Sequence, residues 1–351
     1  MFTLITEDHR LIADTVDKVF EDLAAADAAQ RQTGLKPLEA ASIAAALVEL
    51  GLGAGIDADP FMSSALVQAQ IAVASGRASL SYPVLEDLLG QALGGLLGRD
   101  LAMVGVSTSA PGLRLDAGRI KGVAERVAFA EHRSTVLARA AMWQGEALVL
   151  IPATLPGMCA TFRATIEPDY PLSDIAVGVA ATAGGVEVFH DRTAVRALRL
   201  RSDLLAAAEI VGACQRMVTM TREHLSSRTQ FGQPLGAYQA LKHRLAGAHV
   251  QVEASLAALV YAAAASDADD STAEAQILGV KRFVGAAGKQ VADAAMQLHG
   301  AIGYTLEYPL HQFMRRAHRL GASFTSGADL DRRLFDQFQN EAAGVADVAR
   351  P

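Results

Sequence analysis

The sequence has few of the groups that enzymes use without a cofactor. Among 351 residues there are two cysteines, Cys159 and Cys214, which lie far apart and show no metal-ligand spacing. The nine histidines form no HExxH or similar metal motif, and no GxSxG nucleophile elbow occurs. No GxGxxG follows a predicted strand, and GxxxxGK[ST] is missing. We therefore expect no metal site, no Rossmann unit and no P-loop.

The chain also lacks a basic charge balance and a long apolar run. It carries 31 Lys and Arg against 38 Asp and Glu, a net charge of −7, which argues against a nucleic-acid partner. Its first twenty residues are charged and amphipathic, without the apolar core of a signal peptide. The longest apolar run, 255–266, is too short to span a bilayer. The sequence predicts a cytoplasmic protein without a membrane span.

Hydrophobic patterning divides the chain into three parts. Residues 1–100 show helical periodicity, and 101–200 contain short segments rich in Val and Thr, typical of an antiparallel sheet or small barrel. Residues 201–351 return to longer helices joined by short turns, as in a four-helix-type bundle. Ser202 or Asp203 is the expected N-cap of the first bundle helix, which runs to about Ser227. The predicted fold is α+β, with an N-terminal helical domain, a middle β domain and a C-terminal bundle.

Three stretches resemble the acyl-CoA dehydrogenase family. "RTQFGQPLGAYQALKHRLA" (228–246) is similar to the family's Arg-x-x-Phe-Gly turn and following helix. "QLHGAIGYTLEYPLHQFMRRAH" (297–318) resembles its Gln-x-x-Gly-Gly-x-Gly-Tyr segment, which runs on to an Arg-Asp-Ala, and "FTLITEDHRLIADTV" resembles its opening helix. The order of the predicted domains is that of the family.

The resemblance implies an FAD site shared between subunits. In this family the Arg-x-x-Phe turn holds the ADP half of a neighbour's FAD, which assigns Arg228, Phe231 and Gln239 to the dinucleotide. A second side would be lined by Gln297, Leu298, His299, Gly300 and Ala301. Without the resemblance, Arg228 would be a surface charge and Gly300 a helix C-cap. Ala301 replaces the family's second glycine, which narrows the room for close backbone approach.

Motifs that hold the flavin ring are missing from the β domain. The family has Thr-Glu-Pro-x-x-Gly-Ser-Asp and a later Trp-Ile motif, where this chain reads "LAMVGVSTSAPGLRLDAG" and "IKGVAERVAFAEHR". The single tryptophan, Trp143, falls in a later strand. The chain is therefore not expected to hold an isoalloxazine ring of its own.

The catalytic base is missing as well. Removing an α-proton from an acyl-CoA needs a carboxylate, and counting from Met314 places Phe324 where the family has its glutamate. A minority of members carry the base on the first bundle helix, which corresponds to Ser202 with Asp203 adjacent. We interpret Asp203 and Glu307 as structural residues and expect no catalytic residue in this chain.

The pattern favours a non-catalytic subunit of an α2β2 acyl-CoA dehydrogenase, in which a related catalytic subunit binds most of the acyl-CoA. Some steroid-degrading members are built this way, and such an enzyme would pass electrons to a flavoprotein or similar acceptor. One alternative is a homotetrameric flavoenzyme that uses Asp203 or Glu307 as base. Another is a flavin-free scaffold that only binds a partner.

Overall fold

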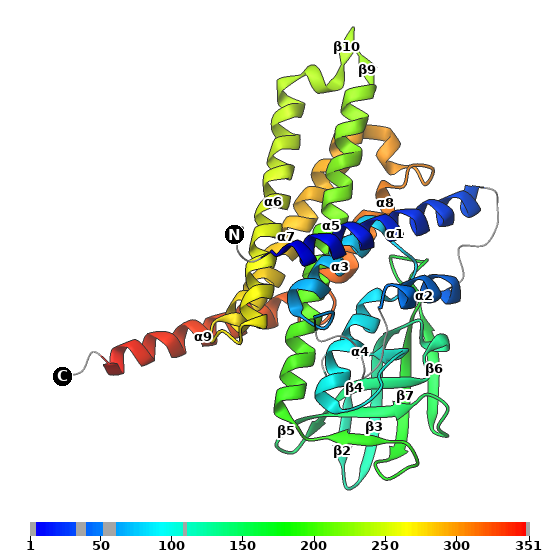
Figure 1. Cartoon of the computed structure of the whole chain (residues 1–351), viewed down its shortest axis with the longest axis vertical. Coiled ribbons are helices and arrows are strands. Elements are labelled where there is room, and N and C mark those ends of the chain that lie inside the picture. The colour runs from blue at the N-terminus through cyan, green and yellow to red at the C-terminus, as the bar shows by residue number, and fades with distance from the viewer. Residues whose placement is uncertain (1–4, 33–39, 52–60, 108–110, 349–351) are drawn as a thin grey trace.

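The computed structural model describes residues 5–32, 40–51, 61–107 and 111–348. Helices come first, a sheet follows, and a helical bundle ends the chain, as expected for the α+β fold (Figure 1). The first helices are α1 (Glu7–Gln32), α2 (Ala40–Glu49), α3 (Ala65–Ala78) and α4 (Val84–Leu97). The later helices are α5 (Arg192–Ser227), α6 (Gln239–Asp267), α7 (Ala273–His299), α8 (Leu310–Gly321) and α9 (Gly327–Val348).

The middle part is an eight-stranded sheet in the order β6-β7-β3-β2-β4-β5-β8, with β1 paired to β4. It is antiparallel except for the β1–β4 and β2–β4 pairs, which are parallel. One face carries its own apolar core, which includes Leu113, Ile120, Val149 and Ile175. The strands are β1 (Val104–Val106), β2 (Leu113–Asp116), β3 (Arg119–Ala128), β4 (Thr135–Met142), β5 (Gly145–Pro152), β6 (Met158–Arg163), β7 (Leu172–Ala180) and β8 (Glu187–Phe189).

Two glycines let α3 cross α5 at backbone contact. A Cβ added to Gly76 would lie 2.0 Å from Glu209 O, and one added to Gly212 would lie 1.9 Å from Val73 O. Any side chain at either position would push the helices apart. This crossing joins the N-terminal helices to the bundle through one continuous core.

The first bundle helix, α5, begins earlier than expected. Its N-cap is Asp191, whose carboxylate accepts from Thr193 N at 2.7 Å. The predicted cap at Ser202 or Asp203 is wrong, because both residues lie buried inside the helix. The predicted end at Ser227 is confirmed. At 36 residues α5 is roughly 54 Å long, so its two ends belong to different regions of the molecule.

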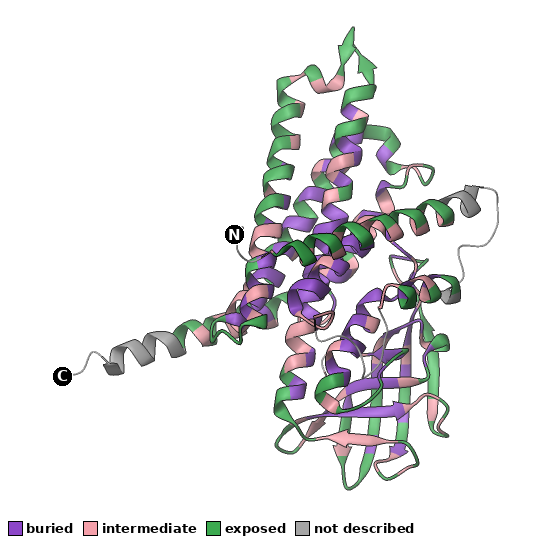
Figure 2. Ribbon diagram, in the orientation of Figure 1, coloured by how far each residue is buried: buried purple, intermediate pink, exposed green. Residues whose placement is uncertain are grey.

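Helix α6 is the one helix in the described part of the chain that is long and apolar enough to cross a membrane by length and composition. In its most apolar 18 residues, 44% are buried, and the helix packs against α3, α5 and α7. Its first turns, together with the last turns of α5, are largely exposed (Figure 2). The bundle therefore ends in an exposed helical hairpin.

Candidate functional site

The turn between α5 and α6 forms the apex of this hairpin (Figure 1). Two short strands, β9 (Thr229–Gln230) and β10 (Gln233–Pro234), pair through Gln230 and Gln233. Phe231 and Gly232 between them have φ of 53° and 82°, as in a type I′ turn. Phe231 is 91% exposed, so its ring lies open among the described residues. We call residues 228–239 the cofactor tip, after the role that the sequence predicts for them.

Arg228 caps α5, and its backbone N–H donates to His224 O at 2.9 Å. Its guanidinium has no carboxylate partner among the residues that the structure describes. Gln239 is the first residue of α6 and is exposed. The cofactor tip therefore presents a free cation, an open aromatic face and an amide at one end of the bundle.

The second predicted segment, 297–301, lies at the end of α7. Gly300 is the C-cap with φ of 64°, and Gln297, Gly300 and Ala301 are exposed. Leu298 and His299 are buried, with 5% and 4% of their surface accessible, so they offer little surface to a ligand. The C-cap role of Gly300 is confirmed, since its backbone N–H donates to Met296 O.

Histidine contacts hold the two segments at one end of the bundle. The rings of His224 and His299 stack with centroids 4.7 Å apart, and His299 Nε2 lies 3.1 Å from Tyr308 Oη. His299 Nδ1 lies 2.8 Å from Ala295 O. Burial, and then the charges of His299 and Arg228, hold the pKa of His224 below its usual value. The structure thus brings Arg228 and the end of α7 to neighbouring positions.

One position expected for a catalytic base lies inside α5, away from the cofactor tip. Asp203 precedes Arg228 by 25 residues, which is roughly 37 Å along the helix. It is fully buried and accepts from Thr325 N at 3.1 Å and from Thr325 Oγ1 at 2.5 Å. Phe324 beside it has φ of 62° and packs against the core. Asp203 therefore anchors the loop that holds Phe324, as a structural residue.

Glu307 lies in a different environment from the buried Asp203. It is exposed in the loop before α8, next to Tyr308 and hence near the cofactor tip. That location places it far along the bundle from Phe324, so Glu307 and Asp203 cannot serve the same reacting atom.

Lys281 of α7 is buried near Asp203. Its Nζ donates to Leu320 O at 2.5 Å. Burial lowers the pKa of Lys281 to about 8, against the opposing effect of the Asp203 carboxylate. This buried contact ties α7 to the end of α8, where Leu320 O also accepts from Ser323 N at 3.2 Å.

A buried ion network centred on α8 was missed at the sequence level. A basic helical stretch such as 314–319 is typical of a solvated or interface face, but the side chain of Arg316 is buried and that of Arg319 nearly so. Arg316, with 1% of its surface accessible, donates to Glu167 Oε1 at 2.7 Å, Glu209 Oε1 at 3.0 Å and Leu80 O at 2.7 Å. The signal was present, since Arg316 shares helical spacing with the buried Leu310, Phe313 and Leu320.

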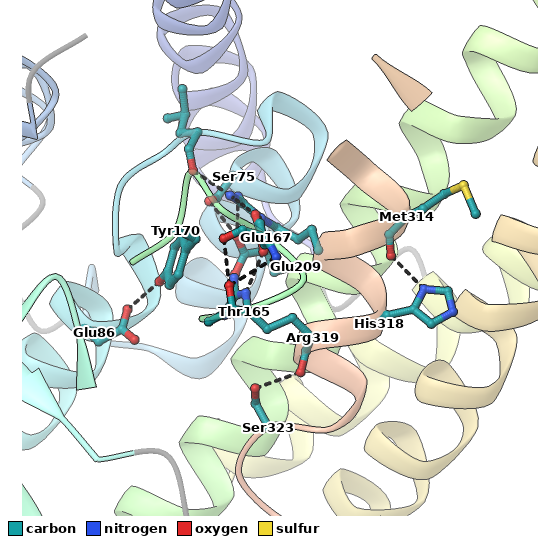
Figure 3. A network of polar contacts seen from close by, with 12 residues as sticks. Ser75, Glu86, Thr165, Glu167, Tyr170, Glu209, Met314, His318, Arg319 and Ser323 are labelled. Carbon is teal, nitrogen blue, oxygen red and sulfur yellow. Dashed lines mark hydrogen bonds and ion pairs between the residues drawn. The ribbon is translucent and has the colours of Figure 1, made fainter. Parts of the chain in front are cut away.

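The network continues into the other two parts of the chain (Figure 3). Arg319 Nε donates to Glu167 Oε2 at 2.6 Å, and its guanidinium lies 3.8 Å from the centroid of Tyr170. Tyr170 Oη donates to Glu86 Oε2 at 3.0 Å. Burial opposes ionisation of Glu167, but Arg316 and Arg319 hold its pKa below the usual value. We call this set the α8 network; it joins α4, the sheet and the bundle.

Features of the chain fit one half of an FAD. The free guanidinium of Arg228 suits a pyrophosphate, and the open ring of Phe231 suits stacking. The other half of FAD is the isoalloxazine ring. Trp143 is 96% exposed at the β4–β5 turn, so it does not line an enclosed pocket for that ring. Part of the stretch that replaces the family's ring-binding motif, 108–110, lies outside the described residues.

Comparison with known proteins identifies relatives. Residues 201–325 match the family model described as acyl-CoA dehydrogenase, C-terminal domain. The acyl-CoA dehydrogenase IpdE2 of Mycobacterium tuberculosis is 32% identical over 196 residues, which cover 48% of this chain and 60% of that protein. The chain thus spans little more than half of this curated relative.

Two solved structures share the fold over almost the whole chain. The ChsE4–ChsE5 complex from Mycobacterium tuberculosis has a TM-score of 0.80 at 21% identity, covering 95% of this chain and 98% of that one. A variant of the Tcur3481–Tcur3483 steroid ACAD has a TM-score of 0.82 at 22% identity, covering 96% and 99%. The expected resemblance and the order of helices, sheet and bundle are confirmed.

Proposed function

Starting from a chain that has the acyl-CoA dehydrogenase fold, with residues 201–325 belonging to the C-terminal domain of that family, we propose that it is the non-catalytic subunit of a heteromeric acyl-CoA dehydrogenase. Members of the family bind FAD. In our proposal the chain provides contacts to the ADP half of a partner's FAD and has no base of its own.

The cofactor tip carries this proposal. A free guanidinium and a 91% exposed phenylalanine on a projecting turn suit a ligand that is completed by another chain. Arg228 would donate charge-assisted hydrogen bonds to the pyrophosphate, and Phe231 would pack against the adenosine. Gln239 and the exposed backbone at 300–301 would complete this side.

The hydrogen bonds of Asp203, the carboxylate that fixes the loop beside Phe324, support a division of labour. Bound FAD supplies the hydride acceptor for α,β-desaturation of a thioester. The accompanying proton needs a base, and both oxygens of Asp203 already accept hydrogen bonds from Thr325. The partner subunit would supply the base, the ring pocket and most of the acyl-CoA contacts, and electrons would leave through a flavoprotein or similar acceptor.

Two of the related solved structures support a heteromer. The ChsE4–ChsE5 complex and the Tcur3481–Tcur3483 steroid ACAD each pair two differently named chains. By analogy we propose an α2β2 assembly in the cytoplasm that acts on a steroid-derived acyl-CoA.

The experiment is to purify the chain alone and co-expressed with a catalytic acyl-CoA dehydrogenase subunit, and to record absorbance spectra of both. We expect a colourless single chain and a yellow co-purified complex. A single chain that is yellow and reduces an electron acceptor with an acyl-CoA would favour the homotetramer and reopen the search for a base at Asp203 or Glu307. A complex whose flavin content is unaffected by Arg228→Ala would favour the scaffold.

A further inference from the structure

We propose that a cavity between α1, α3, α5 and α6 binds an amphipathic carboxylate, meaning a molecule with an anionic head and an apolar body that carries a hydroxyl. The cavity has an outer chamber of about 540 Å³ and an adjacent inner chamber of about 260 Å³, and Arg77 and Gln215 line both. It is separate from the cofactor tip and the α8 network, so it does not depend on the subunit role.

The inner chamber would hold the apolar body. Its walls come from two helices that face each other across it, and α1 borders the same space. The apolar lining consists of Leu66, Ala69 and Val73 of α3 and Leu256, Leu259 and Val260 of α6. Water in such a chamber is readily displaced by a hydrocarbon chain.

Unpaired cations mark the outer chamber as the site of the anionic head. Two of its basic residues already have partners. Arg77 contacts both carboxylate oxygens of Asp17, with Oδ2 at 2.6 Å, and His249 Nδ1 lies 3.8 Å from Glu253 Oε1. Arg222 and Lys242 also line the chamber, and neither has a carboxylate partner in the described ranges. The chamber therefore has an excess of positive charge beside apolar walls.

Two buried hydrogen-bond acceptors in the inner chamber could be satisfied by a donor group on the ligand. Gln70 Oε1 and Gln215 Oε1 are buried without a hydrogen-bond partner, and both side chains line the inner chamber. A hydroxyl on the bound molecule would satisfy one of them. Gln215 precedes Arg222 by seven residues, roughly 10 Å along α5, which sets the spacing between hydroxyl and carboxylate.

Three probes separate these contributions: decanoate, 10-hydroxydecanoate and 1-decanol, titrated calorimetrically into the full-length chain and into its co-purified complex. We expect decanoate to bind at least about ten times more tightly than 1-decanol. We expect 10-hydroxydecanoate to bind about threefold to tenfold more tightly than decanoate. An ordered water that satisfies both glutamines would remove the hydroxyl's advantage and contradict that part of the proposal.

Variants assign each effect to its residues. Arg222→Ala with Lys242→Ala should weaken decanoate about tenfold and leave 1-decanol unchanged. Gln215→Leu should remove the advantage of 10-hydroxydecanoate without changing decanoate. Arg244→Ala, an exposed cation of α6 outside the cavity, is the matched control. Equal binding of all three probes, indifference to the double variant, or no saturable binding to chain or complex would overturn the proposal; the last would point to a protein surface there.

Discussion

Arginines occupy two opposite environments in this molecule. In the α8 network, Arg316 is 1% exposed and is held by two carboxylates and a carbonyl. At the cofactor tip, Arg228 is exposed and has no carboxylate partner among the described residues. A buried ion whose partners are all present rigidifies the fold, whereas a free guanidinium on a projecting turn adds nothing to it. Arg316 thus stabilises the fold, whereas Arg228 is the residue that we propose contacts another molecule.

The backbone shows the same contrast. Phe231 adopts φ of 53° at a turn where its ring is 91% exposed. Phe324 adopts φ of 62°, but its ring packs on the core and its neighbour Thr325 is fixed by Asp203. Left-handed backbone at a bulky residue costs free energy, and of these two phenylalanines Phe324 has packing contacts that offset the cost.

Replacing Arg316 should give the largest loss of stability. Arg316→Met leaves Glu167 and Glu209 buried without their main partner, so we expect a loss of roughly 3–5 kcal/mol in the free energy of unfolding. Urea denaturation followed by circular dichroism measures this. Arg315→Met, the adjacent arginine that makes no ion pair in the described structure, is the control and should stay within about 0.5 kcal/mol. Equal stabilities of the two variants would show that the network contributes nothing.

Lys281, another buried basic residue, should make the stability of the fold depend on pH. Its pKa is lowered in the folded state from 10.5 to about 8, so the unfolded chain binds more protons between these values. The buried ammonium therefore destabilises the fold below about pH 8. As the pH rises from about 8 to 10.5 this penalty disappears, and the free energy of unfolding increases by roughly 3 kcal/mol. Lys281→Met should lack this rise. The measurement is the difference in Tm between wild type and variant from pH 7 to pH 10, and a pH-independent difference would contradict the lowered pKa.

Arg228→Ala tests the exposed arginine, which should matter for FAD binding and not for folding. Folding should change by less than about 0.5 kcal/mol, because the side chain has no ion pair to lose. In the co-expressed complex we expect FAD affinity to fall about tenfold to a hundredfold, which corresponds to lost charge-assisted hydrogen bonds. Flavin fluorescence on dilution measures the affinity. Lys121→Ala, an exposed cation on β3, should leave it unchanged.

Phe231→Gly should stabilise the fold slightly. Glycine adopts positive φ freely, so we expect the free energy of unfolding to rise by no more than about 1 kcal/mol. The flavin content of the complex should fall, because the stacking face is gone. Phe162→Ala, an exposed aromatic on β6, is the control that should retain flavin. A Phe231→Gly complex with full flavin would remove this residue from the proposed site.

Local signals predicted part of this fold and failed where partners lie far apart in sequence. The end of α5 at Ser227 and the cap at Gly300 follow from turn chemistry within a few residues. The start of α5 was misplaced because its cap, Asp191, follows directly on a strand. Asp203 resembled a helix cap because its true partner, Thr325, lies 122 residues away. Glu167 gave no signal, since its partner Arg316 is 149 residues distant.

The candidate site divides in the same way. The cofactor tip could be recognised because Arg228, Phe231 and Gln239 lie within twelve residues, in a motif that resembles a family pattern. The stacking of His224 on His299, which brings the two segments together, depends on how α5 packs against α7. Helix packing over that separation is not encoded in any short pattern.

Native mass spectrometry of the co-expressed complex tests the central claim most directly, because it counts chains and flavins in one particle. We predict two copies of each chain with two FAD molecules, and no flavin on this chain when it is sprayed alone. Four FAD molecules in the complex, or a stoichiometric flavin on the single chain, would contradict the account.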